Sequence, residues 1–501
     1  MKKFLKLLFS RVTVIGILIL LQLIAFAFMV YLSISIDYTW GFYIAIGLEI
    51  FSILVAIYIL GKDMHPTYKI AWVAPILMVP IFGGLFYILY SQRNYGKKTV
   101  IKANKLVEIR KDLTQELLLT DTIGASKILA TNYYPTFKDS KIDFIKTGKE
   151  TFENIIEDLK KAKNFILVQF FIVKKGKLFN EFMEILDQKV QEGVEVFFLY
   201  DDFGSNGLPM YFYKKLRKKG YRATTFNKVR PHINFAMNYR NHRKLVIIDG
   251  IIGYTGGINL ADEYIGMEER FGYWLDDGLK VEGNAVWSFT ISFFEDWELQ
   301  TKEKIDRLFY KVDQESFNLN NSITPYADVS INNQLNAKNI LLHMISNAEK
   351  YVYVSSPYLI IDYELENAFS QAAKRGIDVR ILIPEIPDKK LIYMVSLSYA
   401  KDLAKNNVKI YKYTPGFNHA KALLVDGQAA NVGTTNFDYR SFFLHFENNV
   451  YFEDDKAIIQ LKDFFIKAFE ESKLNSYEDL RNKSFIYRTI QNFFKAFSTL
   501  L

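Results

Sequence analysis

The sequence predicts an α/β protein made of two similar halves and preceded by membrane helices. Three observations support this prediction. Residues 1–90 contain long uncharged apolar runs, short apolar runs alternate with longer helical patterns in the remainder, and one motif occurs twice. Alternation of this kind is typical of sheets covered by helices.

Composition limits the kind of protein and its partners. A chain of 501 residues has room for about two or three domains. It contains no cysteine, which excludes disulfides, thiolate metal sites and a cysteine nucleophile. The net charge of +8 suits an anionic partner, either a nucleic acid or an acidic membrane surface. Composition alone does not separate these two partners.

The N-terminal membrane segment, residues 1–92, contains three hydrophobic runs. Residues 12–34 carry no charge, and residues 41–60 carry only Glu49, so each run is long enough to cross a bilayer. Prolines and glycines interrupt the third run, residues 70–90, which suits a re-entrant segment as well as a broken spanning helix.

Basic residues predict the orientation of this segment. Lysine and arginine are concentrated before the first run, between the second and third runs, and directly after Tyr90, in a basic linker at 93–135. The positive-inside rule places all three regions in the cytoplasm. We therefore favour two crossings plus a re-entrant third run. This gives a multi-pass cell-membrane protein whose soluble part is cytoplasmic.

The soluble part has an internal repeat. Strand-like runs at 164–173, 193–200 and 244–250 recur in the same order at 350–360, 376–384 and 421–427. This order predicts a first half at 136–310 and a second half at 311–483.

A last segment, 484–501, has the pattern of an amphipathic helix. The apolar stripe consists of Ile486, Ile490, Phe493, Phe494, Phe497 and Leu501. Such a stripe either packs against the preceding domain or lies on a membrane surface.

The doubled motif reads NHRKLVIIDGIIGYTGGIN at 241–259 and NHAKALLVDGQAANVGTTN at 418–436. Five chemically distinctive positions repeat at one offset of 177 residues: His242 and His419, Lys244 and Lys421, Asp249 and Asp426, Gly256 and Gly433, Asn259 and Asn436. This constant spacing indicates two copies of one half-domain related by a pseudo-two-fold axis. One site can then use residues from both copies.

The repeated residue types suit chemistry at a phosphate. The histidine and lysine of each copy alternate along an expected strand and so share one face. Lysine and asparagine can hold phosphate oxygens while one imidazole attacks phosphorus, and a second imidazole can protonate the leaving oxygen from the opposite side. Asp249 and Asp426 complete the expected catalytic set, although each precedes a glycine where a turn role is at least as plausible. No cluster of ligands has metal-binding spacing, so we expect no metal and no cofactor.

These motifs carry a family resemblance. HRKLVIID and HAKALLVD resemble the H-x-K-x4-D signature of the phospholipase D superfamily, and G-x-x-N follows each after six residues. Residues 253–266, 271–286 and 432–450 are similar to segments of bacterial cardiolipin synthases. The resemblance implies two phospholipase D-like half-domains, each a mixed sheet flanked by helices.

The resemblance also implies roles for particular residues. His242 would form a phosphohistidine with the phosphatidyl group and His419 would act as acid and base, with the reverse assignment left open. The phosphate would be bound by Lys244, Lys421, Asn259 and Asn436. Asp276 and Glu447 would orient the two imidazoles.

The sequence departs from the family pattern at a few positions. Gly257 and Thr434 stand where serine is common, and His445 stands where asparagine is usual. Leu275 and Gly278 replace an arginine and a histidine. These departures bear on acceptor specificity more than on the chemistry.

The resemblance implies transfer of a phosphatidyl group from one phosphatidylglycerol to another, giving cardiolipin and glycerol. The alternative is a membrane-bound phospholipase D that hydrolyses or transphosphatidylates other phospholipids. Hydrophobic spans argue against a nuclease, and two complete motifs argue against an inactive scaffold. The expected partners are phosphatidylglycerol, other anionic phospholipids and the membrane, with no nucleic acid. The oligomeric state stays open.

Overall fold

A computed structural model describes most of the soluble part and some of the N-terminal segment. The described ranges are 38–62, 66–78, 97–119, 124–138, 140–228, 238–314, 321–332, 334–453 and 456–500, with isolated positions 20, 24, 27, 28, 31, 87, 317 and 319. The chain divides into two compact units, Met1–Asn94 with Thr499–Leu501, and Tyr95–Ser498. Each unit is described by itself.

The first unit contains helices α3 (Tyr38–Leu60) and α4 (Pro66–Met78). Among the described residues, one helix, Thr39–Leu60, is long and apolar enough to cross a membrane, and it includes the expected span at 41–60. The expected span at 12–34 lies outside the described residues apart from isolated positions. Residues 70–78, the beginning of the third run, form the later part of α4, and Pro75 lies inside this helix. Most of the rest of the third run lies outside the described residues. Multi-pass topology therefore stays a prediction.

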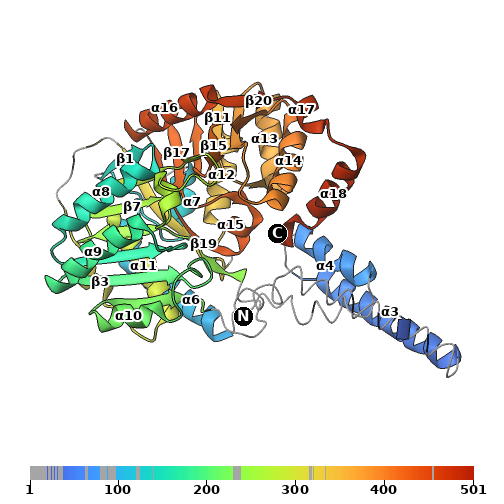
Figure 1. Ribbon diagram of the computed structural model, residues 1–501, viewed down its shortest axis with the longest axis horizontal. Coiled ribbons are helices and arrows are strands. Elements are labelled where there is room, and N and C mark those ends of the chain that lie inside the picture. Colours follow the sequence, from blue (N-terminus) through green and yellow to red (C-terminus); the bar gives the residue numbers. More distant parts are fainter. Residues whose placement is uncertain are drawn as a thin grey trace. The chain divides into compact units, whose positions relative to one another are not determined.

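The second unit contains two large sheets with matching strand order (Figure 1). The first sheet runs β1 (Lys141–Ile145), β9 (Gly278–Glu282), β7 (Ile252–Gly256), β6 (Leu245–Ile248), β2 (Phe165–Phe170), β3 (Glu195–Asp201) and β4 (Arg222–Phe226). The second runs β10 (Ser322–Asp328), β19 (His445–Glu453), β17 (Ala429–Gly433), β16 (Ala422–Val425), β11 (Tyr351–Ser355), β13 (Asp378–Pro384), β14 (Lys409–Tyr413) and β20 (Ser472–Asn475).

Strand directions match as well as strand order. In each sheet the first four pairings are antiparallel. The next two are parallel: β2 with β3 and β3 with β4, or β11 with β13 and β13 with β14. The added strand β20 pairs antiparallel with β14 at the edge. Two mixed sheets flanked by helices confirm the predicted α/β fold class.

Helices cover both faces of the sheets. They are α6 (Lys97–Thr114), α7 (Gly124–Ala130), α8 (Gly148–Lys161), α9 (Lys177–Gln191), α10 (Phe212–Lys218), α11 (Val286–Gln300), α12 (Asn336–Ser346), α13 (Tyr363–Lys374), α14 (Lys390–Ala404), α15 (Tyr439–Phe443), α16 (Lys456–Glu470), α17 (Tyr477–Arg481) and α18 (Phe485–Ala496). Short 3₁₀ turns are η1 (Gln115–Leu117), η3 (Asp262–Ile265), η4 (Arg307–Tyr310) and η5 (Ser498–Leu500).

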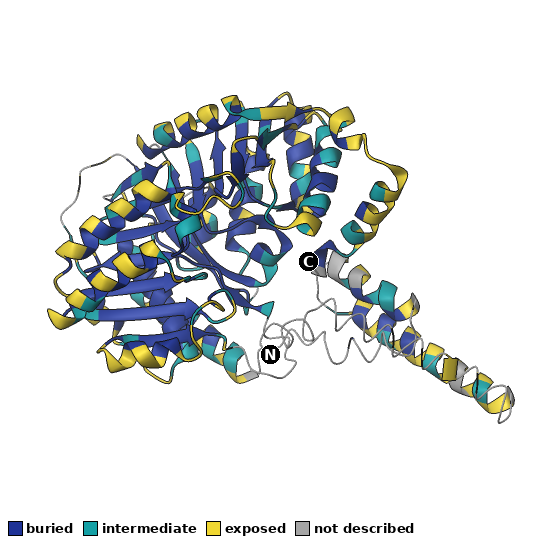
Figure 2. Cartoon of the chain, in the orientation of Figure 1, coloured by how far each residue is buried: buried dark blue, intermediate teal, exposed yellow. Residues whose placement is uncertain are grey.

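The strands of the sheets are largely buried (Figure 2). Side-chain alternation explains how the first sheet fills two cores. Phe165 and Leu167 of β2 join a core that contains α11, α16 and strands of both sheets. Ile166 and Val168 point to the other face and pack with α8, α9 and α10. Because successive strand residues face opposite sides, the largely apolar strand β2 is buried on both faces.

The expected basic linker contains α6, which packs on the soluble unit. Arg110 of α6 is buried and donates to both carboxylate oxygens of Glu295 on α11, at 2.8 and 3.0 Å. A paired buried arginine fixes a helix in place, so this part of 93–135 belongs to the body of the soluble unit.

Short strands join the two halves. β5 (Arg240–Asn241) pairs in parallel with β19 of the second half, and β8 (Tyr273–Leu275) pairs in parallel with β15 (Gly416–Asn418). The remaining short pair is β12 (Leu359–Ile360) with β18 (Phe437–Asp438). The first two pairings are reciprocal, and each continues directly into one copy of the repeated motif.

Candidate active site

Each histidine–lysine pair lies in a short extended link that feeds one of the central strands. Residues 242–244 connect β5 to β6, and residues 419–421 connect β15 to β16. The pairs therefore precede the strands, which corrects the expectation that they lie within them. His242 and His419 are each 7% exposed, and both lysines are buried.

The two halves exchange carboxylates at the histidines. Nδ1 of His242 lies 2.9 Å from Oε2 of Glu447, which comes from the second half. Nδ1 of His419 lies 2.8 Å from Oδ2 of Asp276, which comes from the first half. With Nδ1–H donated to a carboxylate, Nε2 of each ring keeps its lone pair for chemistry. The sequence left open which carboxylate meets which histidine, and the structure pairs each histidine with the carboxylate of the other half.

Backbone pairing between the halves sets this geometry. The His242 amide donates to the Phe446 carbonyl at 2.9 Å, and the His419 amide donates to the Leu275 carbonyl at 2.7 Å. Phe446 and Leu275 each directly precede the carboxylate that meets the imidazole. The register of β5 on β19 and of β15 on β8 therefore places each carboxylate beside its histidine.

A buried polar network holds the first link rigid. Arg243 is fully buried and donates to the Glu447 carbonyl at 3.0 Å and to Asp296 at 2.9 Å. Asn241 and Gln169 donate to the same Asp296 oxygen at 2.6 and 2.7 Å. A buried charge with this many partners fixes both the link and the backbone of Glu447.

Burial and nearby positive charge shift the pKa values of the ionisable groups in the site toward their uncharged forms. Burial lowers the pKa of His242 and of His419 well below the usual value, and the charges of Lys244 and Lys421 lower both further. Burial also lowers the pKa of Lys244 to about 7 and raises the pKa of Asp276 to about 7. A bound anion would offset the lysine charges, so the site favours an anionic ligand.

The lysines retain hydrogen-bonding capacity for that ligand. Lys244 donates to the carbonyl of His242 at 2.6 Å, and Lys421 donates to the carbonyl of His419. Lys421 Nζ also lies 3.1 Å from His419 Nδ1, farther than the Asp276 oxygen, so we assign the Nδ1 proton to the carboxylate. An ammonium has three donors, which leaves some of each lysine's donors for phosphate oxygens.

The two expected phosphate-binding asparagines differ. Asn259 accepts from the Ile172 amide at 2.9 Å and donates to the Tyr264 hydroxyl at 2.8 Å, so its amide already supports the fold. The ring of Tyr264 lies 5.4 Å from that of His419, between centroids. Asn436 is buried and its amide oxygen has no hydrogen-bond partner among the described residues. A direct phosphate contact stays a prediction for both.

Asp249 and Asp426 hold strand beginnings and do not face the histidines. The Asp249 carboxylate accepts the backbone amides of residues 163, 164 and 165 at 2.7–2.9 Å. The Asp426 carboxylate accepts those of residues 349, 350 and 351 at 2.7–2.8 Å. Both aspartates follow the far ends of β6 and β16, in left-handed turns with φ of 52° and 55°. This geometry corrects their place among the expected catalytic residues, because three backbone donors already occupy each carboxylate.

Trp274 and His445 occupy equivalent places beside the two carboxylates, whereas the sequence pointed only to His445, as a departure from the family pattern. Trp274 Nε1 lies 3.2 Å from Asp276, and its ring lies 5.3 Å from that of His419. His445 Nδ1 lies 3.4 Å from Glu447, and its ring lies 5.2 Å from that of His242. Each lies two residues before the carboxylate that it contacts, which is the signal that would have paired them. The two imidazoles thus have different aromatic neighbours.

A second asymmetry involves Gly257 and Thr434. The Thr434 hydroxyl donates to Glu447. At the equivalent position in the first half, a Cβ atom on Gly257 would lie 1.9 Å from Oδ1 of Asp276. Glycine is therefore required there by the close approach of the carboxylate.

One group of potential metal ligands lies within the site. Ligand atoms of His242, His445 and Glu447 lie within 4.8 Å of one another, a cluster that sequence spacing did not reveal. Two imidazoles and a carboxylate suit zinc in kind. The neighbouring ammonium groups of Lys244 and Lys421 oppose a cation at this place, which is why we assign no metal step.

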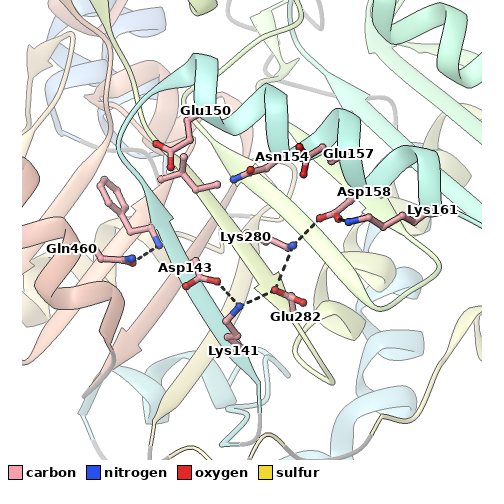
Figure 3. A pocket seen from close by; sticks show the side chains of 12 residues that line it. Lys141, Asp143, Glu150, Asn154, Glu157, Asp158, Lys161, Lys280, Glu282 and Gln460 are labelled. Carbon is pink, nitrogen blue, oxygen red and sulfur yellow. Dashed lines mark hydrogen bonds and ion pairs between the residues drawn. The ribbon is translucent and has the colours of Figure 1, made fainter.

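A crevice of about 320 Å³ is lined by none of the expected site residues (Figure 3). It lies along α8, β1 and β9, with Gln460 of α16 at its margin. Lys280 contacts Asp158 at 2.7 Å and Glu282 at 3.4 Å, and Lys141 contacts Glu282 at 3.1 Å. Its charges satisfy one another, so the crevice is a surface ion-pair network.

Comparisons with known proteins show the broad class of proteins to which the chain belongs. Residues 341–469 match the family model described as "Cardiolipin synthase, PLD-like domain", and residues 50–92 match "Phospholipase_D-nuclease N-terminal". The crystal structure of phosphatidylserine synthase from Haemophilus influenzae Rd KW20 shares the fold, with a TM-score of 0.57 and 14% identity, over 75% of this chain and 97% of that chain. Fold and motifs together define a protein of the phospholipase D class.

Curated relatives show the family within this class to which the chain belongs. A cardiolipin synthase from Halalkalibacterium halodurans is 33% identical over 90% of this chain and 92% of its own length. A cardiolipin synthase from Listeria innocua is 35% identical over 86% of this chain and 92% of its own length. The chain belongs to the cardiolipin synthase family of phosphatidyltransferases, which confirms the resemblance read from its motifs.

Proposed function

We propose that the protein transfers a phosphatidyl group from one phosphatidylglycerol to another, giving cardiolipin and glycerol through a phosphohistidine. The family and its anionic phospholipid chemistry support this assignment. The observation that carries it is the reciprocal pairing of His242 with Glu447 and of His419 with Asp276. Two oriented imidazoles supply a nucleophile and an acid to one phosphodiester.

In the first step, Nε2 of His242 attacks phosphorus and the bond from phosphorus to the headgroup glycerol oxygen breaks. The leaving oxygen takes a proton from His419 and departs as glycerol. That proton is the Nε2 proton of the imidazolium form of His419, whose Nδ1–H stays donated to Asp276, and the bound phosphate favours this form by offsetting the lysine charges. Glu447 stabilises the positive charge that develops on His242.

In the second step, the headgroup hydroxyl of another phosphatidylglycerol gives its proton to His419 while its oxygen attacks phosphorus. The phosphorus–nitrogen bond breaks, which releases cardiolipin and restores His242. Lys244 and Lys421 hold the anionic phosphate oxygens throughout, and the bound anion raises the pKa of both histidines by offsetting the lysine charges. Asn259 and Asn436 would assist by donating their side-chain NH2 groups to phosphate oxygens, and that of Asn259 is already donated to the Tyr264 hydroxyl.

The membrane arrangement is part of this proposal. Helix α3 anchors the chain in the cell membrane, the full segment crosses it more than once, and the soluble unit lies on the cytoplasmic side. The apolar length of Thr39–Leu60 and the basic flanks support it.

The deciding experiment combines product analysis with trapping. Membranes containing His242→Ala, His419→Ala or a control, His343→Ala on α12, are incubated with labelled phosphatidylglycerol and quenched in acid. We expect cardiolipin from wild type and control only, and a covalent phosphatidyl-enzyme in the His419 variant. Accumulation in the His242 variant instead would reverse the two roles. Phosphatidic acid without cardiolipin would indicate the hydrolase alternative.

A further inference from the structure

Helix α18 presents an apolar face to its surroundings (Figure 2). Phe485, Ile486, Ile490 and Phe493 are 76%, 70%, 44% and 56% exposed. Positions separated by four and three residues lie on one face of a helix, so these side chains form a single strip. Exposed large apolar side chains gathered in this way mark an interaction site.

The opposite face of α18 is attached to α14 by polar contacts. Gln491 is 4% exposed and donates to the Met394 carbonyl at 2.8 Å, and Lys495 forms an ion pair with Asp402. A surface helix usually buries its apolar face, whereas α18 buries a glutamine and exposes its isoleucines. Ile486, Ile490 and Phe493 of the expected stripe therefore point away from the domain, whereas Phe494 and Phe497 are half-buried.

The beginning of α14 links this strip to the candidate active site. Lys389 donates to the Tyr358 hydroxyl at 2.8 Å. The Ser356 hydroxyl donates to the Tyr358 carbonyl at 2.7 Å and accepts the amide of Phe437, the residue after Asn436, at 3.1 Å. Met394, which lies under α18, follows Lys389 by five residues, about 8 Å along a helix. Ile386 and Leu391, on either side of Lys389, are also exposed.

Positive charge accompanies the apolar strip. Lys483, Arg488, Lys389 and Lys390 are exposed around it. Lys483 and Arg488 make no ion pair with any residue that the structure describes. Apolar side chains flanked by unpaired cations match the headgroup layer of a bilayer that contains anionic lipid.

We propose that the apolar strip of α18, together with Ile386 and Leu391, docks the soluble unit on an anionic bilayer surface with the active site at the headgroup layer. The choice of a lipid bilayer as the binding partner of this strip rests on the proposed function, in which both substrates are membrane lipids. Charge complementarity favours lipid over a second copy of the chain, whose equivalent strip would carry the same positive charge. Docking of this kind lets the substrate headgroup reach the histidines while its acyl chains stay in the bilayer.

The absence of cysteine from the chain allows a direct depth measurement. Single variants Ile490→Cys and Phe493→Cys, with Glu153→Cys on α8 as control, are labelled with a polarity-sensitive fluorophore and placed as full chains in bilayers carrying nitroxide-labelled lipid. We expect quenching at both α18 positions to be at least about twofold that at the control, and stronger with phosphatidylglycerol than with phosphatidylcholine alone. Quenching equal to the control would overturn the proposal, as would self-quenching between copies without lipid quenching.

A second measurement tests the consequence for turnover. The triple variant Ile486→Ser/Ile490→Ser/Phe493→Ser should lower the ratio of activity on bilayers to activity on detergent-dispersed substrate by about tenfold. Asn492→Ser, an exposed change on the same helix, should keep that ratio. An unchanged ratio in the triple variant would contradict docking. Because the depth measurement needs no turnover, it separates failure of this proposal from failure of the proposed reaction.

Discussion

Replacing Gly257 with alanine should disable the acid–base half of the site without unfolding the protein. The new Cβ would lie 1.9 Å from Oδ1 of Asp276, 2.9 Å from its Cγ and 3.0 Å from the carbonyl oxygen of His419. The buried carboxylate must therefore move by about 1 Å or more, and misplacement of that size in a positioned group costs about 100-fold in rate. This loss corresponds to about 2.7 kcal/mol of transition-state stabilisation.

The assay is transfer of labelled phosphatidylglycerol in proteoliposomes, with kcat and KM determined separately for Gly257→Ala. The reduction should lie in kcat, because the lysines that hold the phosphate are untouched. Thr434→Ser keeps the hydroxyl beside Glu447, and at Gly207 a Cβ would meet nothing within 4 Å, so Thr434→Ser and Gly207→Ala serve as controls. A Gly257→Ala enzyme with kcat within about threefold of wild type would refute the argument that this carboxylate orients His419.

Four further outcomes are expected. Asp249→Ala and Asp426→Ala should each lower the free energy of unfolding by about 2–4 kcal/mol, because three backbone donors lose their acceptor. Activity per folded molecule should be unchanged. Loss of activity with a normal melting temperature would instead support a catalytic role for the aspartate. The pKa of Lys244 is lowered to about 7, so its charged form declines as pH rises above 7 and the KM for phosphatidylglycerol should increase there. In Lys244→Arg, which stays charged, KM should remain level across this range. A wild-type KM that does not change with pH would contradict this prediction. Dialysis against EDTA should leave kcat unchanged, whereas a loss restored by zinc would assign a metal to the cluster around His445. His445→Ala should lower kcat by about tenfold at constant KM, because Glu447 loses a neighbouring imidazole, and equal rates for variant and wild type would make that contact incidental.

Much of the fold was predictable because its signals are local. Buried strands such as β2 and β13 are mostly apolar runs bounded by helical patterns, and their repetition along the chain predicted two similar sheets. The pairing of β5 with β19 was beyond prediction, since β5 has only two residues and its partner is about two hundred residues away. No local pattern specifies such a contact.

The site was predictable where spacing repeats and unpredictable where the halves differ. His242 and His419 share the same internal spacing with their lysines, and the family resemblance supplied Asp276 and Glu447. The equivalence of His445 and Trp274 was missed because their chemical types differ, although each contacts an orienting carboxylate. In both motif copies the aspartate directly precedes a glycine, which suggested a catalytic role for Asp249 as readily as a role in a turn. The three backbone amides that donate to its carboxylate indicate the structural role.

The exchange of carboxylates between halves has a consequence for synthesis of the chain on the ribosome. The first half emerges first and can begin to fold while the second half is still being made. At that stage His242 lacks Glu447, and His419, the proposed acid–base residue, has not been translated. A nascent or prematurely terminated chain can therefore reach the membrane without being able to cleave its lipids, and competence arises only when the last strands of the second sheet have joined the first.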